Sequence, residues 1–140
     1  MRNVTSTVLN KWFNEVWNNG NESAIDELMT KDADAHGILA PGQPKGPEGF
    51  KQFFHSFRNQ FHNIKIDVED VVSQDDIESA RTVVHATHAE TGKDVTFSGI
   101  CMVRVEDGKI AEAWNNYDFL SMHEQLGKNL TSTAAASVTP

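Results

Sequence analysis

Apolar side chains recur at helical spacing in the first part of the chain. Between residues 6 and 18 they lie three and four positions apart, and the run ends at an Asn-Asn-Gly-Asn sequence. This pattern predicts an amphipathic helix. The shorter run Ser23–Met29 predicts a second helix. Pro47–Phe61 predicts a third helix, because a proline opens it and phenylalanines follow at helical spacing. This phenylalanine stripe consists of Phe50, Phe53, Phe54, Phe57 and Phe61.

The period changes to two after Asn63, where apolar and polar side chains begin to alternate. Alternation predicts β-strands with one buried face. We expect strands over 64–72, 80–90, 95–105 and 109–118, a strand fragment over 34–39 in the preceding Gly/Pro-rich loop, and a helical turn over 122–126. The pattern predicts an α+β fold, with three N-terminal helices packed on a strongly curved, mainly antiparallel sheet. A length of 140 residues suits one domain, expected over 1–130, with 131–140 as a flexible tail.

The last predicted hairpin, around Asp107 and Gly108, allows two registers. A two-residue turn would pair Cys101 with Trp114, whereas a three-residue loop with Gly108 in a bulge would shift the pairing by one residue. The register decides which side chains share a face, because strand residues alternate between faces. We expect the three-residue loop, since it gathers small side chains together. One face would then hold Phe97, Gly99, Cys101, Val103, Ala111, Ala113, Asn115 and Tyr117, and the other Ile100, Met102, Arg104, Ile110, Glu112 and Trp114.

The small residues on the first face have two interpretations. Protein interiors are close-packed, so bulky helix residues either fill the space above Gly99, Cys101 and Ala113 or leave a cavity there. In the second case Asn115 and Tyr117 would be the few polar groups of a mostly apolar ligand pocket. Both interpretations stay open.

The second face carries Ile100, Met102 and Trp114 and is too apolar to remain in contact with water. It predicts a homodimer formed through the outer face of the sheet. The net charge of −8 argues against a nucleic-acid partner, which needs clustered Lys and Arg. No apolar run approaches the roughly 18 residues of a membrane span. The single cysteine excludes an internal disulfide, and the N-terminal residues have no apolar block followed by a small-residue cleavage site, so no secretory signal is expected. Both observations favour a cytoplasmic location.

Acid–base chemistry has three candidate residues. His36 and Asp34 lie in the long loop, and Asp118 ends the last strand; a His–Asp pair could move a proton near neutral pH. Each has a structural alternative, with His36 on the surface and Asp118 capping the following turn. Tyr117 could donate a hydrogen bond to a carbonyl or extend toward water.

Two further histidines and the cysteine are additional candidates for the site. His85 and His88 point to opposite faces of one strand, so at most one reaches the pocket. The spacing of the six histidines matches no metal motif, and no metal is expected. Cys101 shows no activating neighbour and is interpreted as core or pocket lining.

The segment FSGICMVRVEDGKIAEAWNNYDFLSMHEQLG resembles the C-terminal half of SnoaL-like polyketide cyclases, within the nuclear-transport-factor-like group of cone-shaped α+β barrels. The resemblance rests on the F-S-G opening, the R-x-x-D-G-K-I hairpin, the W-x-x-x-D spacing and the closing Q-L-G. It covers about residues 5–128. The resemblance implies a pocket between the helices and the concave sheet face, and cofactor-free ring closure by intramolecular aldol condensation. At the positions of the family's aspartate acid/base and its histidine partner this chain has Asn115 and Cys101.

Three hypotheses follow. The chain is a cofactor-free cyclase, isomerase or dehydratase acting on a carbonyl compound, with His36, Asp34 and Asp118 as catalytic residues. Alternatively, it binds a small apolar or carbonyl-containing molecule without reaction, or it is a structural dimer with a filled core. The expected ligand-binding residues are Asn115, Tyr117, Cys101, Gly99, Ala113, Phe53, Phe57, His88 and Trp17.

Overall fold

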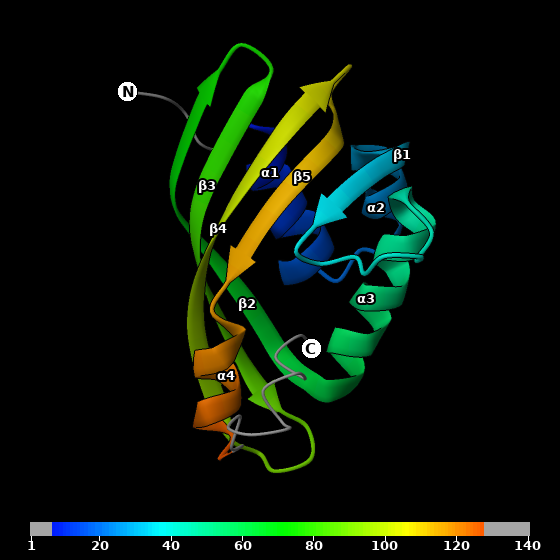
Figure 1. Cartoon of the computed structure of the whole chain (residues 1–140). Helices are drawn as coiled ribbons and strands as arrows, with labels where there is room; N and C mark the ends of the chain where they lie inside the picture. The colour runs from blue at the N-terminus through cyan, green and yellow to red at the C-terminus, as the bar shows by residue number, and fades with distance from the viewer. Residues whose placement is uncertain (1–6, 128–140) are drawn as a thin grey trace.

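Five strands form one strongly curved sheet in the order β1-β5-β4-β3-β2, and helices α1, α2 and α3 lie on its concave side (Figure 1). The computed structural model describes residues 7–127, so the predicted tail at 131–140 lies outside the described residues. The elements are α1 (Val8–Trp12), the π-helix η2 (Phe13–Asn18), α2 (Ser23–Leu28), β1 (Met29–His36), α3 (Gly46–Gln60), β2 (Phe61–Gln74), β3 (Ile77–His88), β4 (Asp94–Glu106), β5 (Lys109–Tyr117) and α4 (Phe119–Gln125). The α+β class and the long strands are confirmed. The helix predicted over 6–18 is divided into α1 and η2, and the turn predicted over 122–126 is part of the helix α4.

The first helix begins at Val8 because two side chains satisfy its free backbone N–H groups. The hydroxyl of Thr7 accepts from the N–H of Asn10 at 3.1 Å. The carboxylate of Glu78, on β3, accepts from the N–H groups of Val8 and Leu9 at 3.2 and 2.9 Å. Helix N-termini leave such donors unpaired, and an acid there also interacts favourably with the helix dipole. The helix is therefore fastened to the sheet at its start.

The first strand differs from the prediction. The fragment expected over 34–39 is instead the eight-residue strand β1, which begins at Met29, the residue predicted to end the second helix. The four long strands form an antiparallel meander, and β1 adds a parallel strand at its edge beside β5, so the sheet is mixed. The prediction failed because the pairing joins segments nearly 80 positions apart, which no local pattern reveals. The strand ends before Gly37, whose φ of +85° favours glycine.

The β4–β5 hairpin combines both predicted registers. Asp107 and Gly108 form a two-residue turn, both with positive φ (52° and 77°), so the predicted three-residue loop is wrong. A bulge then shifts the pairing between Arg104 and Val105, leaving Ala111 as the extra residue. Beyond the bulge Cys101 pairs with Asn115 and Val103 with Ala113, as predicted.

The bulge also places Ile110 on the opposite face from the one predicted. Ile110 was expected on the outer face with Trp114, but it is buried and only 2% exposed. The extra residue reverses the alternation on β5, so residues before and after it change sides. Ala111 is half-buried, whereas Ala113 is buried in the core as expected.

Candidate ligand-binding site

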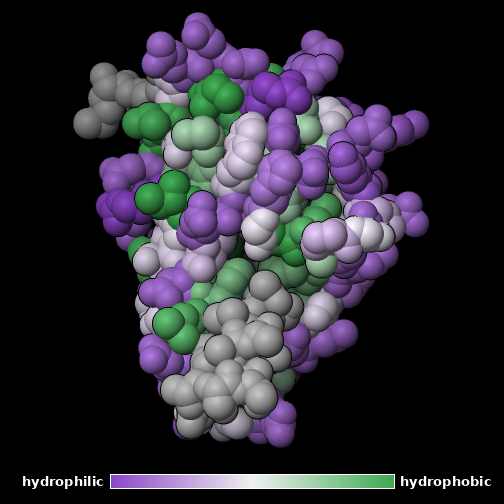
Figure 2. All heavy atoms as spheres, viewed as in Figure 1, coloured by the Kyte–Doolittle hydropathy of each residue, from purple (hydrophilic) through white to green (hydrophobic). Residues whose placement is uncertain are grey.

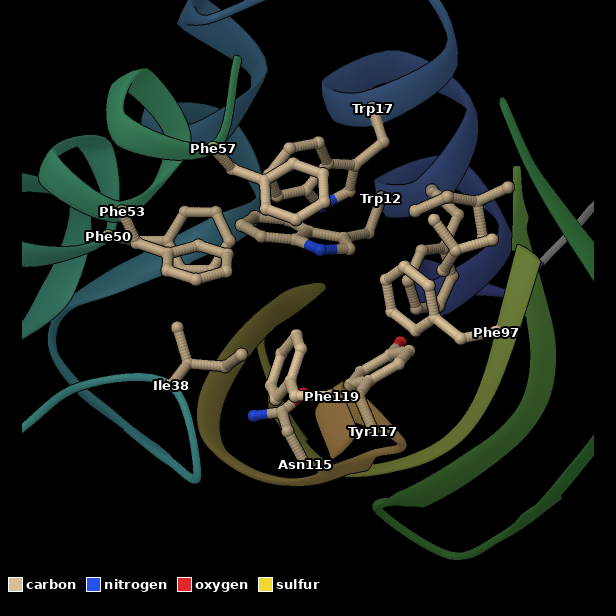
Figure 3. A pocket seen from close by; sticks show the side chains of 13 residues that line it. Trp12, Trp17, Ile38, Phe50, Phe53, Phe57, Phe97, Asn115, Tyr117 and Phe119 are labelled. Carbon is tan, nitrogen blue, oxygen red and sulfur yellow. The ribbon is translucent and has the colours of Figure 1, made fainter. Parts of the chain in front are cut away.

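A cavity of about 60 Å³ lies between the helices and the concave face of the sheet (Figure 3). Its walls are largely aromatic and come from α1, η2, the loop after β1, α3, the sheet and the start of α4. The lining residues are Trp12, Phe13, Trp17, Ile38, Phe50, Phe53, Phe57, Ile66, Val84, Phe97, Asn115, Tyr117 and Phe119. Such a composition, apolar with two polar side chains, is typical of small-molecule sites.

Trp17 is the central side chain of the aromatic wall. Its ring centroid lies 5.3 to 6.1 Å from those of four phenylalanines on α3. These are Phe50, Phe53, Phe54 and Phe57, three or four positions apart, which places them along one side of the helix. Edge-to-face and tilted contacts at these distances stabilise aromatic pairs beyond simple burial. Four residues of the predicted phenylalanine stripe therefore pack on Trp17. The fifth, Phe61, was predicted to end the third helix but is the first residue of β2, and its ring stacks on Phe57.

The π-helix η2 and strand β2 position Trp17. η2 ends with the N–H of Asn19 donating to the carbonyl of Asn14, five residues earlier, at 2.8 Å. Asn18 follows Trp17 in the sequence, and its side-chain amide accepts from the N–H of Ile66 at 2.6 Å and donates to the Ile66 carbonyl at 3.0 Å. The Asn18 amide thus makes the two backbone hydrogen bonds that a neighbouring strand would make with Ile66, and it attaches η2 to the sheet. π-helical turns occur often at functional sites, and this one turns Trp17 into the cavity wall.

Asn115 is one of the two polar groups of the cavity. Its side-chain nitrogen donates to the backbone carbonyl of His36 at 3.0 Å, which ties β5 to the end of β1. Figure 3 shows this amide nitrogen turned toward the side from which Ile38 comes. Gly37 packs so closely on the backbone oxygen of Asn115 that a Cβ atom there would overlap it. The orientation of the Asn115 amide is thus set by the chain segment at 36–37.

Tyr117 is the second polar group. Its hydroxyl lies 3.3 Å from that of the fully buried Thr82. Burial, and to a lesser degree the nearby Cys101, raises the pKa of Tyr117 above its usual range. The phenol therefore stays protonated and can donate a hydrogen bond. Its ring lies over Gly99, where an added Cβ atom would overlap the ring.

The position of Tyr117 explains where the cavity lies relative to the patch of small residues. The ring fills the space above Gly99, and Gly99, Cys101 and Ala113 do not line the cavity. Cys101 and Ala113 are buried in the core. Burial raises the pKa of the Cys101 thiol from 9.0 to about 12, so it is a thiol and a poor nucleophile. Of the two interpretations of the small-residue patch, the first is correct above Gly99, because the Tyr117 ring fills that space. The cavity lies beside the patch.

The cavity opens on one side. Trp12, Phe13 and Trp17 are buried, whereas Ile38, Phe53 and Phe119 are only half-buried. Figure 3 shows Ile38 and Phe119 opposite Phe50 and Phe53. In the same view as Figure 1, hydrophobic atoms are visible in the middle of a mainly hydrophilic surface, between the end of β5 and α3 (Figure 2). The half-buried side chains therefore form the entrance.

His36 and Asp34 lie outside the described lining of this cavity. The His36 side chain is 44% exposed, lies 2.8 Å from Glu112, and stacks on Trp114 with ring centroids 5.8 Å apart. Asp34 is 3.9 Å from His36 and 3.7 Å from Lys45. The structure brings these groups together at the paired ends of β1 and β5, on the outer face of the sheet with Trp114.

Asp118 and His88 also lie outside the cavity lining. The Asp118 carboxylate accepts from the N–H of Ser121 at 3.0 Å and caps α4, which confirms its structural alternative. His88 contacts the ring of Phe61, 5.4 Å between centroids, and its Nδ1 lies 2.9 Å from the Thr91 hydroxyl. Five of the predicted ligand-binding residues do line the cavity: Asn115, Tyr117, Phe53, Phe57 and Trp17.

Several lining residues were not singled out from the sequence. Trp12 and Phe13 follow the same apolar helix pattern as Trp17, and that pattern could have indicated them. Ile38 comes from the Gly/Pro-rich loop, where no periodicity exists. Phe97 and Val84 had been assigned only to strands. Phe97 and Val84 line the same cavity because the sheet is curved.

Residues 7–127 contain neither a metal-binding cluster nor a membrane-spanning helix. No group of three or more His, Cys, Asp and Glu side chains there could hold a metal ion. Within the same range, no helix is long and apolar enough to cross a membrane.

Comparison with known proteins assigns the family. The family model described as SnoaL-like polyketide cyclase matches residues 7–126. A solved structure from Bacillus cereus, whose name places it among the polyketide cyclases, is 32% identical with a TM-score of 0.74, covering 86% of this chain and 78% of that one. IdmH from Streptomyces antibioticus, also named as a polyketide cyclase, is 27% identical with a TM-score of 0.75, covering 86% and 96%.

A more distant structure shares the fold alone. TsrD from Streptomyces laurentii is 20% identical with a TM-score of 0.76, covering 86% of this chain and 92% of that one. A comparison with curated proteins finds no match. The family model spans most of the chain, and the solved structures reproduce its helices and curved sheet. The chain belongs to the SnoaL-like polyketide cyclase family.

Proposed function

We propose that this protein binds a small, largely apolar molecule carrying one oxygen function, in the aromatic cavity. The observation that carries the proposal is the cavity lining: eleven apolar side chains and two uncharged polar ones, Asn115 and Tyr117. Apolar walls favour a ligand by roughly 25 cal/mol for each Å² of apolar surface that it removes from water. The two polar groups fix its orientation.

The polar groups indicate the chemistry of the ligand. The Tyr117 phenol is neutral and supplies an O–H donor, while the Asn115 amide both donates and accepts. A carbonyl oxygen accepts from such donors. A charged ligand group would find no opposite charge among the described lining residues and would lose its hydration on entry.

The size of the cavity limits the size of the ligand that it can hold. About 60 Å³ is less than the roughly 150 Å³ of an engineered cavity that holds benzene, so a ring requires the entrance side chains to move apart. Ile38, Phe53 and Phe119 are half-buried and can do so without uncovering the centre of the core. A single substituted ring is therefore a suitable first ligand.

Acetophenone and ethylbenzene are a matched pair of probes, because they differ in the carbonyl oxygen. We expect acetophenone to bind more tightly in ligand-observed NMR titrations, and Tyr117→Phe to weaken acetophenone about 2- to 13-fold, the loss of one hydrogen bond of 0.5–1.5 kcal/mol. Ethylbenzene affinity should stay unchanged in this variant. Absence of binding by both probes, or equal losses for both, contradicts the proposal.

A second candidate function is cofactor-independent cyclisation, isomerisation or dehydration of a carbonyl compound. Family membership favours it, since the relatives are named as polyketide cyclases. The chain has Asn115 and Cys101 where the family resemblance implies an aspartate and a histidine, and an amide cannot serve as a general base. Tyr117 is the one titratable side chain among the described lining residues. Binding without reaction is therefore the function that the geometry supports best.

Proton exchange separates the two functions. In D₂O, the α-hydrogens of acetophenone should exchange no faster with wild-type protein than in buffer alone. Asn115→Asp places a carboxyl group beside the ligand and should accelerate this exchange. If wild-type protein exchanges them, and His36→Ala or Asp118→Asn lowers that rate by at least about 10²-fold, the protein is an enzyme with those residues as catalytic groups.

A further inference from the structure

Three paired residues form a row across the inner face of the sheet, beside the cavity. Thr82 on β3 pairs with Gly99 on β4, and Gly99 pairs with Tyr117 on β5. Gly99 has no side chain, and an added Cβ atom there would overlap the Tyr117 ring, so the ring lies across β4. Neighbouring strands are only about 4.8 Å apart. The Tyr117 hydroxyl therefore reaches past β4 and lies 3.3 Å from the hydroxyl of Thr82.

Thr82 is buried behind the phenol. It is 0% exposed and does not belong to the cavity lining, whereas Tyr117 does, so Thr82 can influence a ligand only through Tyr117. The Thr82 hydroxyl has two acceptors within reach, the Tyr117 oxygen at 3.3 Å and the Gly99 backbone carbonyl at 3.5 Å. Both distances exceed the usual O–H···O separation of about 2.7–2.8 Å, so neither contact fixes the Thr82 proton.

The hydrogen bonds of this row can run in two directions, because each hydroxyl has one proton to donate and lone pairs that accept. In the first direction, Tyr117 donates to Thr82 and Thr82 donates to the Gly99 carbonyl, which leaves the phenol oxygen able to accept from a ligand. In the second direction, Thr82 donates to Tyr117, and the phenol proton is available to a ligand. The two arrangements differ only in the rotation of two O–H bonds, and the heavy atoms stay in place.

The apolar surroundings make the direction depend on the ligand. A buried hydroxyl proton without an acceptor is unfavourable, and most of the cavity wall offers none. Without a ligand, the first direction satisfies both protons, because the row ends on the Gly99 carbonyl. Burial raises the pKa of Tyr117 above its usual range, so the phenol keeps its proton in either direction. Figure 3 shows the phenol oxygen turned toward Phe97, inside the cavity.

We propose that Thr82 enables the cavity to bind both a carbonyl compound and the corresponding alcohol, by reversing the hydrogen bonds of Tyr117. This inference rests on the proposed function, because it concerns the ligand of the same cavity. A carbonyl oxygen accepts from Tyr117, and Thr82 then donates to the phenol oxygen. An alcohol donates to the phenol oxygen instead, and Tyr117 then donates to Thr82. No proton moves from one oxygen to another in either case.

Acetophenone and 1-phenylethanol test the inference, because they differ only in the carbonyl and hydroxyl groups. In ligand-observed NMR titrations, wild-type protein should bind the two within about 3-fold of each other, since each forms one hydrogen bond with Tyr117. Thr82→Val keeps the shape of the side chain and removes its hydroxyl. This variant should retain acetophenone affinity and bind 1-phenylethanol at least about 5-fold more weakly, because one buried O–H proton loses its acceptor.

Three further variants are controls. Thr82→Ser keeps the hydroxyl and should keep the wild-type ratio of the two dissociation constants. Thr87→Val makes the same chemical change on the same strand, where the hydroxyl donates to Asp94 at 2.8 Å outside the cavity lining, and should also keep the ratio. In a Tyr117→Phe background, Thr82→Val should no longer change the ratio, because Thr82 acts through the phenol. Circular dichroism verifies that each variant is folded.

Raman spectroscopy reports the hydrogen bonds themselves, because Tyr117 is the only tyrosine of the chain. The intensity ratio of the tyrosine ring doublet is low when the phenol only donates a hydrogen bond, and higher when it also accepts one or makes none. Ligand-free wild-type protein should therefore give a low ratio and ligand-free Thr82→Val a high one. Acetophenone should raise the ratio in wild type, where Thr82 begins to donate to the phenol, and lower it in Thr82→Val.

The outcomes separate this inference from the proposed function. If wild-type protein binds both probes and Thr82→Val leaves the ratio of their dissociation constants unchanged, the role of Thr82 is wrong and the proposed function stands. A wild-type protein that binds acetophenone but rejects 1-phenylethanol has the same meaning. If neither probe binds, both proposals fail. Identical doublets in the ligand-free wild type and Thr82→Val would show that Thr82 does not bond the phenol, whatever the cavity binds.

Discussion

The two faces of the β4–β5 hairpin have opposite side-chain sizes. On the inner face Gly99, Cys101 and Ala113 are small, and rings from the helices and from Tyr117 cover that side of the sheet. On the outer face Met102 and Trp114 are large and partly exposed, although each is a chain neighbour of an inner residue. Small residues on a concave face leave room for helices. Large residues on the exposed face have no counterpart within one chain, so Met102 and Trp114 keep apolar surface in contact with water.

The largest expected effect separates an inner from an outer tryptophan. Trp17→Ala removes a ring in contact with four phenylalanines and should lower the free energy of unfolding by about 3–5 kcal/mol. Trp114→Ala should change it by less than about 1 kcal/mol, because Trp114 lies on the surface of the single chain. Urea unfolding at the lowest practical protein concentration measures both without a contribution from association. Equal losses in the two variants would show that the faces do not differ.

A smaller effect is expected where the inner sheet has no side chain. Gly99→Ala forces the Tyr117 ring away and should destabilise the protein by about 1–3 kcal/mol, the usual effect of overpacking. Acetophenone binding should weaken in the same variant. The neighbouring outer substitution, Ser98→Ala, should stay within about 0.5 kcal/mol of wild type. A neutral Gly99→Ala in urea unfolding would mean that the ring does not rest on this glycine.

The pH dependence of stability should reveal the buried thiol. The pKa of Cys101 rises from 9.0 to about 12 in the folded chain, so above pH 9 the unfolded chain loses a proton that the native chain retains. The contribution of this protonated thiol to the free energy of unfolding is therefore fully present below pH 9. It is lost as the pH rises toward 12, by up to about 1.4 kcal/mol per pH unit. Cys101→Ala should show a shallower decline than wild type between pH 9 and 10 in urea unfolding. The outer variant Met102→Ala should keep the wild-type slope; identical slopes in all three proteins contradict the burial of the thiol.

The smallest effect belongs to the outer ion pair. Glu112→Gln removes the 2.8 Å contact with His36, whose side chain is 44% exposed, and should cost less than about 1 kcal/mol because water and salt screen such pairs. Unfolding measured at low and at high salt should show the difference shrinking as salt increases. A loss of several kcal/mol would show that this edge of the sheet supports the inner core through the His36–Asn115 hydrogen bond.

Part of the site could be predicted because local patterns identify it. The predicted residues Phe53 and Phe57 on α3, Trp17 in the N-terminal helical segment, and the pair Asn115 and Tyr117 all line the cavity. Ile38 belongs to a loop and Phe119 is the first residue of the short helix α4, where neither period extends far enough to indicate them. The position of the cavity beside Gly99 also depended on one rotamer of Tyr117, which residue spacing does not specify.

By itself the sequence determined the class of fold, the main helical segments and the alternation of the long strands, because these follow from hydrophobic periods within a few residues. Only the tertiary structure decided that β1 pairs with β5 in parallel, that a bulge turns Ile110 inward, and that His36 lies beside Trp114 on the outer face. These features depend on contacts between distant segments and on the curvature of the sheet. Such contacts form when packing brings the segments together, and the local pattern holds no trace of them.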